Sequence, residues 1–167
     1  HGEALLKIVF KRVLEKHQKE LEILGRDISK LKPIVEKPFV RMTYTEALKI
    51  LKEKCDMEIE WGKDLRTIEE DKLSRLYDVP IICTHYPKKV KAFYMMEDPD
   101  DPRTVQGCDF IGTEGYGEII GGSHREHDIE KVKAALVEDG EDPSEYEFYL
   151  DTRRYGTVPH GGFGLGV

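Results

Sequence analysis

The spacing of apolar residues changes near Val79, and no other feature of the sequence constrains the fold as strongly. Before this point apolar side chains recur at intervals of three and four residues, the period of an amphipathic helix. Beyond it, short segments rich in β-branched and aromatic residues are bounded by Pro, Gly or Asp, as strands commonly are. They are residues 79–83, 90–95, 105–110 and 115–120. The sequence therefore predicts an α+β fold: a mainly helical segment at 1–78, then an antiparallel β-sheet with flanking helices on one side at 79–167.

Three helices are expected before the sheet. The first carries an apolar stripe that includes Phe10 and Leu21, and it ends near Gly25. His17 lies on that stripe, so it is predicted to be packed in the core. A polar, proline-containing stretch at 27–38 then separates the first helix from the second.

Two capping signatures mark where the second and third helices begin. Thr43 is followed three residues later by Glu46, and Thr67 is followed in the same way by Glu70. At this spacing a hydroxyl and a carboxylate cap each other's backbone amides. The Trp-Gly pair at 61–62 is expected to form a turn between the two helices.

Two further helices and a glycine-rich strand are predicted after the sheet segments. One helix closes at Gly140, and the next begins at Asp142 and runs to about Tyr155, with Gly156 beyond its end. Residues 161–167 alternate glycine with bulky residues. We expect a strand there, with glycines that allow something to approach its backbone closely.

The composition argues against several classes of function. The formal net charge of -7 provides no basic field of the kind that a dedicated nucleic-acid-binding module uses. Cys55, Cys83 and Cys108 lack the paired spacing of zinc sites and small disulfide frameworks, so buried thiols in a reducing cytoplasm are expected. No run of 18 apolar residues occurs, so no membrane span is expected.

The segment at 115–126 carries the residues best suited to chemistry. On a regular strand Glu118 and Ile120 point to one face and Ile119 to the other, which would set a carboxylate on the sheet among glycines. Such a face has room for a ligand. From this pattern alone, a hairpin with an exposed glutamate and arginine remains an alternative.

Three further side chains add to this candidate site. Ser123 supplies a hydroxyl, and Arg125 supplies a planar cation that suits a carboxylate, phosphate or carbonyl oxygen. Asp109, at the end of the preceding strand, could bring a second carboxylate close to Glu118. Two carboxylates near a basic group are what a magnesium–nucleotide site requires.

Several motifs together resemble the asparaginyl-tRNA synthetases, a class II family, over most of residues 39–167. The matching stretches are Lys-Ala-Phe-Tyr-Met at 91–95, Gly-Glu-Ile-Ile-Gly-Gly-Ser at 117–123 with Arg-Glu at 125–126, Tyr-Leu-Asp at 149–151, Arg-Arg-Tyr-Gly-Thr-Val-Pro-His at 153–160 and Gly-Phe-Gly-Leu-Gly at 162–166. The last of these is similar to the start of class II motif 3. Aspartyl-tRNA synthetases share the general plan, but the stretches at 91–95 and 153–160 are more similar to the asparagine enzymes.

The resemblance implies a two-step reaction. Asparagine reacts with ATP, with Mg²⁺ as metal, to give asparaginyl-adenylate, and the aminoacyl group then passes to tRNA(Asn). It also implies a homodimer for the full-length enzyme. Glu118 and Arg125 would be catalytic.

The resemblance further implies a role for each candidate residue. The metal would be held by Asp109, Glu118 and Ser123. The residues implied for ATP are Glu118, Ser123, Gly164 and Gly166, and those for the amino acid are Gly121, Gly122, Arg125, His160 and Gly162. Arg125 would meet the side-chain carbonyl of asparagine.

Other family motifs are not recognisable in the chain. Motif 1, motif 2, an anticodon-binding barrel and the Glu-Arg of motif 3 are missing, so residues 1–167 are expected to be one part of a class II catalytic domain. Two rival functions remain open. One is a paralogue that makes free asparagine from aspartate and ATP, and the other is a non-catalytic interaction module.

A first prediction follows from these missing motifs. The 167-residue chain by itself should not catalyse adenylation, since half of the adenylation site is expected to lie elsewhere. Asparagine-dependent exchange between ATP and pyrophosphate is the measurement. Turnover comparable to that of complete synthetases would contradict the prediction.

Overall fold

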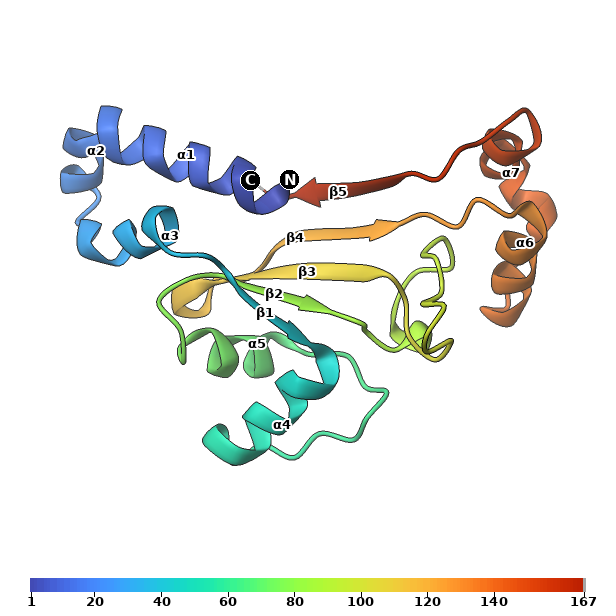
Figure 1. Ribbon diagram of the computed structural model, residues 1–167, viewed down its shortest axis with the longest axis horizontal. Helices are drawn as coiled ribbons and strands as arrows, with labels where there is room; N and C mark the ends of the chain where they lie inside the picture. Colours follow the sequence, from blue (N-terminus) through green and yellow to red (C-terminus); the bar gives the residue numbers. More distant parts are fainter. Residues whose placement is uncertain (167) are drawn as a thin grey trace.

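The computed structural model of the chain describes residues 1–166. Its centre is a five-stranded sheet in the order β1-β2-β3-β4-β5 (Figure 1). The strands are β1 (Val40–Thr43), β2 (Ile81–Thr84), β3 (Gly107–Gly112), β4 (Gly117–His124) and β5 (Gly161–Leu165). β1 runs parallel to β2, and the other neighbours are antiparallel.

The sheet is therefore mixed, and the prediction of a purely antiparallel sheet is wrong at its first strand. β1 has four residues and runs directly into the capping residue Thr43, so its two apolar residues resemble the approach to a helix. The chain passes from β1 to β2 through two helices. A parallel pair requires such a crossover.

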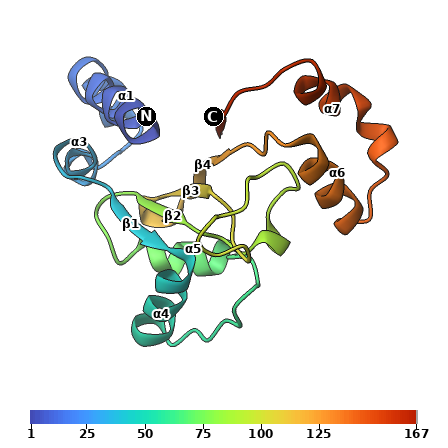
Figure 2. The same ribbon diagram turned by 45° about the vertical axis from the view of Figure 1, so that its right-hand side comes forward.

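Helices cover both faces of the sheet. α4 (Tyr44–Cys55) and α5 (Thr67–Ser74) pack on one face, and α1 (Gly2–Lys16), α2 (Gln18–Ile23) and α3 (Lys32–Glu36) pack on the other (Figure 2). Along β2, Ile81 and Cys83 join the core under α4 and α5, while Ile82 joins the core under α1 and α3. The prediction of helices on one side is wrong because the central strands are apolar on both faces.

The first helical segment is broken at His17. The backbone there leaves the helical region, α1 ends at Lys16, and α2 restarts at Gln18. The break turns Leu21 into the core and leaves the His17 side chain 51% exposed. The prediction of one long helix with a packed His17 is therefore wrong. The expected end near Gly25 is confirmed, since this residue has a φ of 64° after the last turn.

One expected loop and one expected strand differ from the structure. Residues 27–38 contain a 3₁₀ turn (Ile28–Lys30) and α3 rather than a plain polar connection. Residues 90–95 do not form a strand. They follow a 3₁₀ turn (Lys88–Val90), and an isolated bridge joins Met95 to Arg125, the residue just beyond β4. This segment instead forms a loop over the face of the sheet that carries Asp109 and Glu118.

The capping predictions are confirmed at α4 and displaced at α5. Thr43 and Glu46 form the expected capping box. At α5 the helix begins one residue earlier, because the Glu69 carboxylate accepts from the backbone N–H of Arg66 at 2.9 Å. Glu70 is therefore not used as a cap, and its carboxylate is free to face the sheet.

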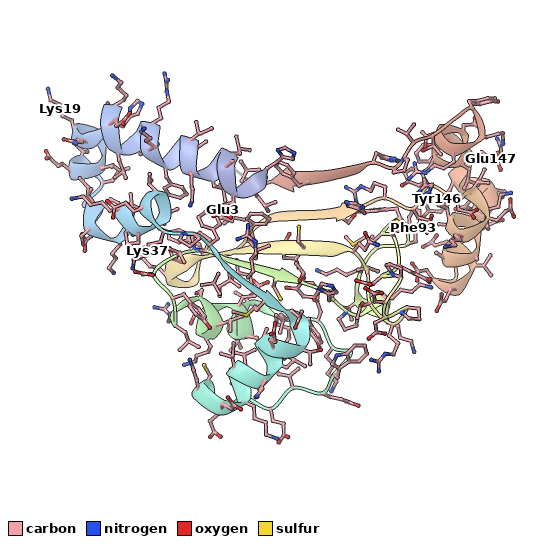
Figure 3. All side chains as sticks on the ribbon, in the orientation of Figure 1. Glu3, Lys19, Lys37, Phe93, Tyr146 and Glu147 are labelled. Atoms are coloured by element: carbon pink, nitrogen blue, oxygen red, sulfur yellow. The ribbon has the colours of Figure 1, made fainter. Side chains whose placement is uncertain are left out.

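The C-terminal helices form a small unit beside the sheet. α6 (Ile129–Glu138) and α7 (Glu147–Arg154) pack through Val132, Leu136 and Leu150, and α7 is preceded by a 3₁₀ turn (Pro143–Tyr146). Phe93 joins the loop at 91–95 to this unit, since the centre of its ring lies 5.3 Å from the centre of the Tyr146 ring (Figure 3). Within residues 1–166 no helix is both long and apolar enough to cross a membrane.

Candidate active site

A one-residue bulge at Ile119 decides which side chains share a face of the sheet. Phe110 pairs with Ile120, and Ile111 pairs with Glu118, which leaves Ile119 as an extra residue between the two pairs. Ile119 and Ile120 consequently both pack into the core under α1 and α3. The expectation that Glu118 and Ile120 share a face is wrong, because the bulge turns Glu118 to the opposite side.

Glu118 faces Asp109 across Gly121. Asp109 and Gly121 are directly paired in the sheet. A Cβ atom at Gly121 would collide with Oε1 of Glu118 and would lie 3.8 Å from Oδ1 of Asp109. Glycine at position 121 therefore allows the two carboxylates to approach one another, which is the arrangement the sequence predicted.

The two carboxylates line a cavity of about 450 Å³ on this face of the sheet. Gly121 and Gly164 are paired on its floor, and a Cβ atom at Gly164 would meet no atom within 4 Å. The loop at 91–95 forms one wall through Lys91, Tyr94 and Met95. The bare glycine floor gives a flat ligand direct access to the sheet.

Arg125 lies at the far end of the cavity and is held from several directions. Its Nη1 donates to the Ser123 hydroxyl at 2.7 Å, and its guanidinium stacks over the Tyr94 ring at 4.5 Å. Nη2 also donates to the Gly162 carbonyl at 3.4 Å. These contacts fix a planar donor group beside the glycine floor, where it can meet a ligand carbonyl or carboxylate.

The remaining predicted residues lie around this cavity in different ways. Gly122 contributes backbone to the lining, but its missing side chain faces Phe163 on the opposite face. His160 is exposed, and its Nδ1 donates to the Val158 carbonyl, while its own carbonyl accepts from the Arg125 amide. The amide of Gly166 donates to the Ile119 carbonyl at 3.2 Å. The structure thus brings the His160 backbone, but not its imidazole, to the site.

The charged groups in and beside the cavity shift one another's pKa values. Burial, and then the nearby charge of Asp109, raise the pKa of Glu118 above its usual value. Burial also raises the pKa of Glu70, and the Glu118 and Asp109 charges add to this shift. Burial opposes the charged form of Lys91, but the attraction and hydrogen bond of Asp109 outweigh it and raise the pKa of Lys91.

The Asp109 and Glu118 pair fits a magnesium ion. Magnesium is usually held by one or two carboxylates, with water and substrate phosphates completing its shell. In the part of the chain that the structure describes, no three acidic, histidine or cysteine side chains form a closed metal cluster. The hydroxyl of Ser123 is engaged by Arg125, so a metal contact from Ser123 stays a prediction.

Sequence reasoning misses three residues that line the cavity, Lys91, Tyr94 and Met95. The pattern at 90–95 predicts a strand, but the segment is a loop that lies over the sheet. Glu70 is also missed, because the pattern predicts a capping role for it, whereas its carboxylate lies against the backbone of Gly117 and Glu118. Arg66 and Glu69 have the same spacing as Thr67 and Glu70, one residue earlier in the chain. This second pair is the signal in the sequence that Glu69, rather than Glu70, could cap the helix.

Comparison with known proteins gives consistent matches. The family model described as tRNA synthetases class II (D, K and N) matches residues 2–167. The chain is 50% identical over 165 residues to the asparagine–tRNA ligase of Pyrococcus horikoshii, covering 99% of this chain and 38% of that protein. The chain therefore spans well under half the length of this relative.

Solved structures agree with the sequence match. The Pyrococcus horikoshii asparaginyl-tRNA synthetase complexed with asparaginyl-adenylate superposes with a TM-score of 0.93 at 50% identity, covering 99% of this chain and 38% of that one. The Entamoeba histolytica asparaginyl-tRNA synthetase in complex with asparaginyl-adenylate gives a TM-score of 0.85 at 33% identity, covering 99% and 37%.

The raised pKa of Glu70 predicts how stability depends on pH. A carboxyl with a higher pKa in the folded state stabilises the fold below its ordinary value of 4.5, and that contribution is lost as pH rises through the folded pKa. Glu70→Gln should therefore unfold at higher urea than the wild type at pH 7, with the difference shrinking towards pH 4. The exposed Glu53→Gln is the control. A Glu70→Gln variant that is less stable than wild type at pH 7 would contradict the account.

Proposed function

The chain belongs to the class II tRNA synthetases of the D, K and N group, and from that membership we propose that it carries part of the site where an asparagine–tRNA ligase activates asparagine. The observation that carries the proposal is the open glycine floor between the Asp109–Glu118 pair and Arg125. A flat ligand with a charged phosphate end and a polar side-chain end matches this floor. Asparaginyl-adenylate has both ends.

Arg125 is proposed to recognise the side chain of asparagine. Its guanidinium offers donors to the carboxamide oxygen, while Ser123, Tyr94 and Gly162 hold it in place. The 50% identity to an asparagine–tRNA ligase supports asparagine as the amino acid.

The acidic end is proposed for the nucleotide. ATP is the proposed co-substrate, and Mg²⁺ held by Asp109 and Glu118 would neutralise charge on its phosphates. The chain itself would orient the two substrates: Gly121 and Gly164 let the ligand lie flat, and Arg125 fixes its other end. The protein would then contribute mainly position and electrostatic stabilisation rather than covalent chemistry.

The roles of four more residues remain part of the same proposal. Ser123 is proposed as a third oxygen ligand of the metal, available only when its hydroxyl is not engaged by Arg125. Gly166 is proposed at the nucleotide end, and Gly122 and His160 at the amino-acid end, through the backbone that lines or adjoins the cavity.

The wider functional assignment follows from the family. We propose tRNA(Asn) as the acceptor of the second step and a homodimer as the assembly of the full-length enzyme. The names of the relatives support the acceptor, and the class II resemblance supports the dimer. We propose the cytoplasm as the compartment, where Cys55, Cys83 and Cys108 would stay reduced. All three are free thiols in the fold, but only Cys83 is buried, so the prediction of buried thiols is wrong for the other two.

Replacing the guanidinium tests the proposed substrate. In the protein at its full natural length, Arg125→Lys should lower kcat/KM for asparagine in ATP–pyrophosphate exchange by on the order of a hundredfold, because lysine cannot reproduce the fixed planar fork. The KM for ATP should change much less.

The matched control is Arg154→Lys, since Arg154 is on the surface of α7 and pairs with Glu147. Wild-type exchange that responds to aspartate rather than asparagine would overturn the proposed function. Unchanged kinetics in Arg125→Lys would remove Arg125 from the amino-acid site.

A further inference from the structure

Lys91 forms a buried ion pair with one of the proposed metal ligands. Its Nζ lies 2.6 Å from Oδ2 of Asp109, and the two side chains are 12% and 6% exposed. The ammonium also lies 4.0 Å from the centre of the Tyr86 ring, which is fully buried. Packing and charge together hold Lys91 at the edge of the cavity, so it is not a freely moving surface lysine.

The two oxygens of Asp109 face different partners. Oδ2 accepts from Lys91, whereas Oδ1 is the atom directed at Gly121, where Oε1 of Glu118 also lies. A cation between Asp109 and Glu118 would therefore use Oδ1. Lys91 keeps that oxygen free while it neutralises the other.

The same ammonium must repel a divalent ion bound at this pair. A positive charge close to a dication disfavours its binding, and it does so more strongly in a partly buried cavity than in water. Asp109 and Glu118 alone would attract a free divalent ion strongly. With Lys91 present, one of the two negative charges is already compensated.

We propose that Lys91 is a built-in counter-cation that weakens the binding of a free divalent ion at Asp109 and Glu118, so that the ion is held firmly only together with nucleotide phosphates. The inference rests on the proposed function, since it assumes that this pair receives the nucleotide's metal. Lys91 acts through Asp109 and is a positioning residue. It would keep the cavity from filling with metal before ATP arrives.

The test measures binding of Mn²⁺ alone, as a probe of the divalent site. Free Mn²⁺ is followed by electron paramagnetic resonance in the protein at its full natural length, without nucleotide or amino acid. Lys91→Met keeps an unbranched side chain and removes the charge. It should bind Mn²⁺ about tenfold more tightly than wild type, or better.

Three variants serve as controls. Lys91→Arg retains the charge and should bind Mn²⁺ as the wild type does, as should Lys89→Met, which removes an exposed lysine two residues away. In Lys91→Met with Asp109→Asn, the gain in affinity should disappear. If Lys91→Met does not fold, Lys91→Gln is measured in the same way and decides the question.

The outcomes separate this inference from the function on which it rests. Unchanged or weaker Mn²⁺ binding in the neutral variant overturns the role of Lys91, even where calorimetry finds that the wild type binds ATP only with Mg²⁺ present. If the wild type binds no ATP under any metal condition, the proposed function fails and the inference fails with it. Tighter Mn²⁺ binding in Lys91→Met alone supports the inference.

Discussion

The extra residue at Ile119 is the constraint on which the candidate site depends. A regular β4 would carry Glu118 and Ile120 on the same face, so either an isoleucine would stand in the cavity or a carboxylate would enter the core under α1 and α3. With the bulge, two consecutive isoleucines fill the core and Glu118 is turned towards Asp109. One additional residue therefore allows β4 to serve a hydrophobic core and a charged cavity at once.

The cavity is assembled from parts that are distant in the chain. α5 brings Glu70 beneath Gly117 and Glu118, the loop after η2 (Lys88–Val90) brings Lys91 and Tyr94 over the sheet, and β5 completes the floor. The α6–α7 unit packs against this loop, because the Phe93 ring contacts those of Tyr146 and Tyr149, and the buried Arg153 donates to the Tyr149 hydroxyl. Tyr149 in turn lies beside Tyr94, and the Arg125 guanidinium lies over the Tyr94 ring. The position of Arg125 thus depends on helices that do not line the cavity.

Local signals predicted the helices and most strands, whereas the long-range arrangement was less accessible. The Thr43–Glu46 box, Asp142 and the positive-φ glycines at 140 and 156 act within a few residues, so the sequence alone was sufficient there. β1 escaped prediction since a four-residue parallel strand is defined by its partner. His17 was misassigned because periodicity cannot detect a break in a helix.

The candidate site follows the same division. Residues close together in sequence are predicted to act together: Glu118 and Gly121 lie in β4, Arg125 directly follows it, and all three line one cavity. Lys91 reaches that cavity, and Glu70 reaches the Glu118 backbone beside it, through tertiary contacts that no sequence period encodes, so both are missed. The segment at 91–95 is one of the stretches that resemble the asparaginyl-tRNA synthetases. Only the fold shows that this segment forms a wall of the cavity.

The most direct test of the account is a methyl group on the floor between the two carboxylates. Gly121→Ala would push the flexible end of Glu118 away from Asp109 while leaving the backbone pairing of β3 and β4 intact. Calorimetric titration of the full-length protein with ATP in the presence of Mg²⁺ should find binding weakened by about tenfold, ~1.4 kcal/mol, with the free energy of unfolding little changed. Wild-type affinity for ATP in a folded Gly121→Ala protein would contradict the claim that this face of the sheet binds the nucleotide.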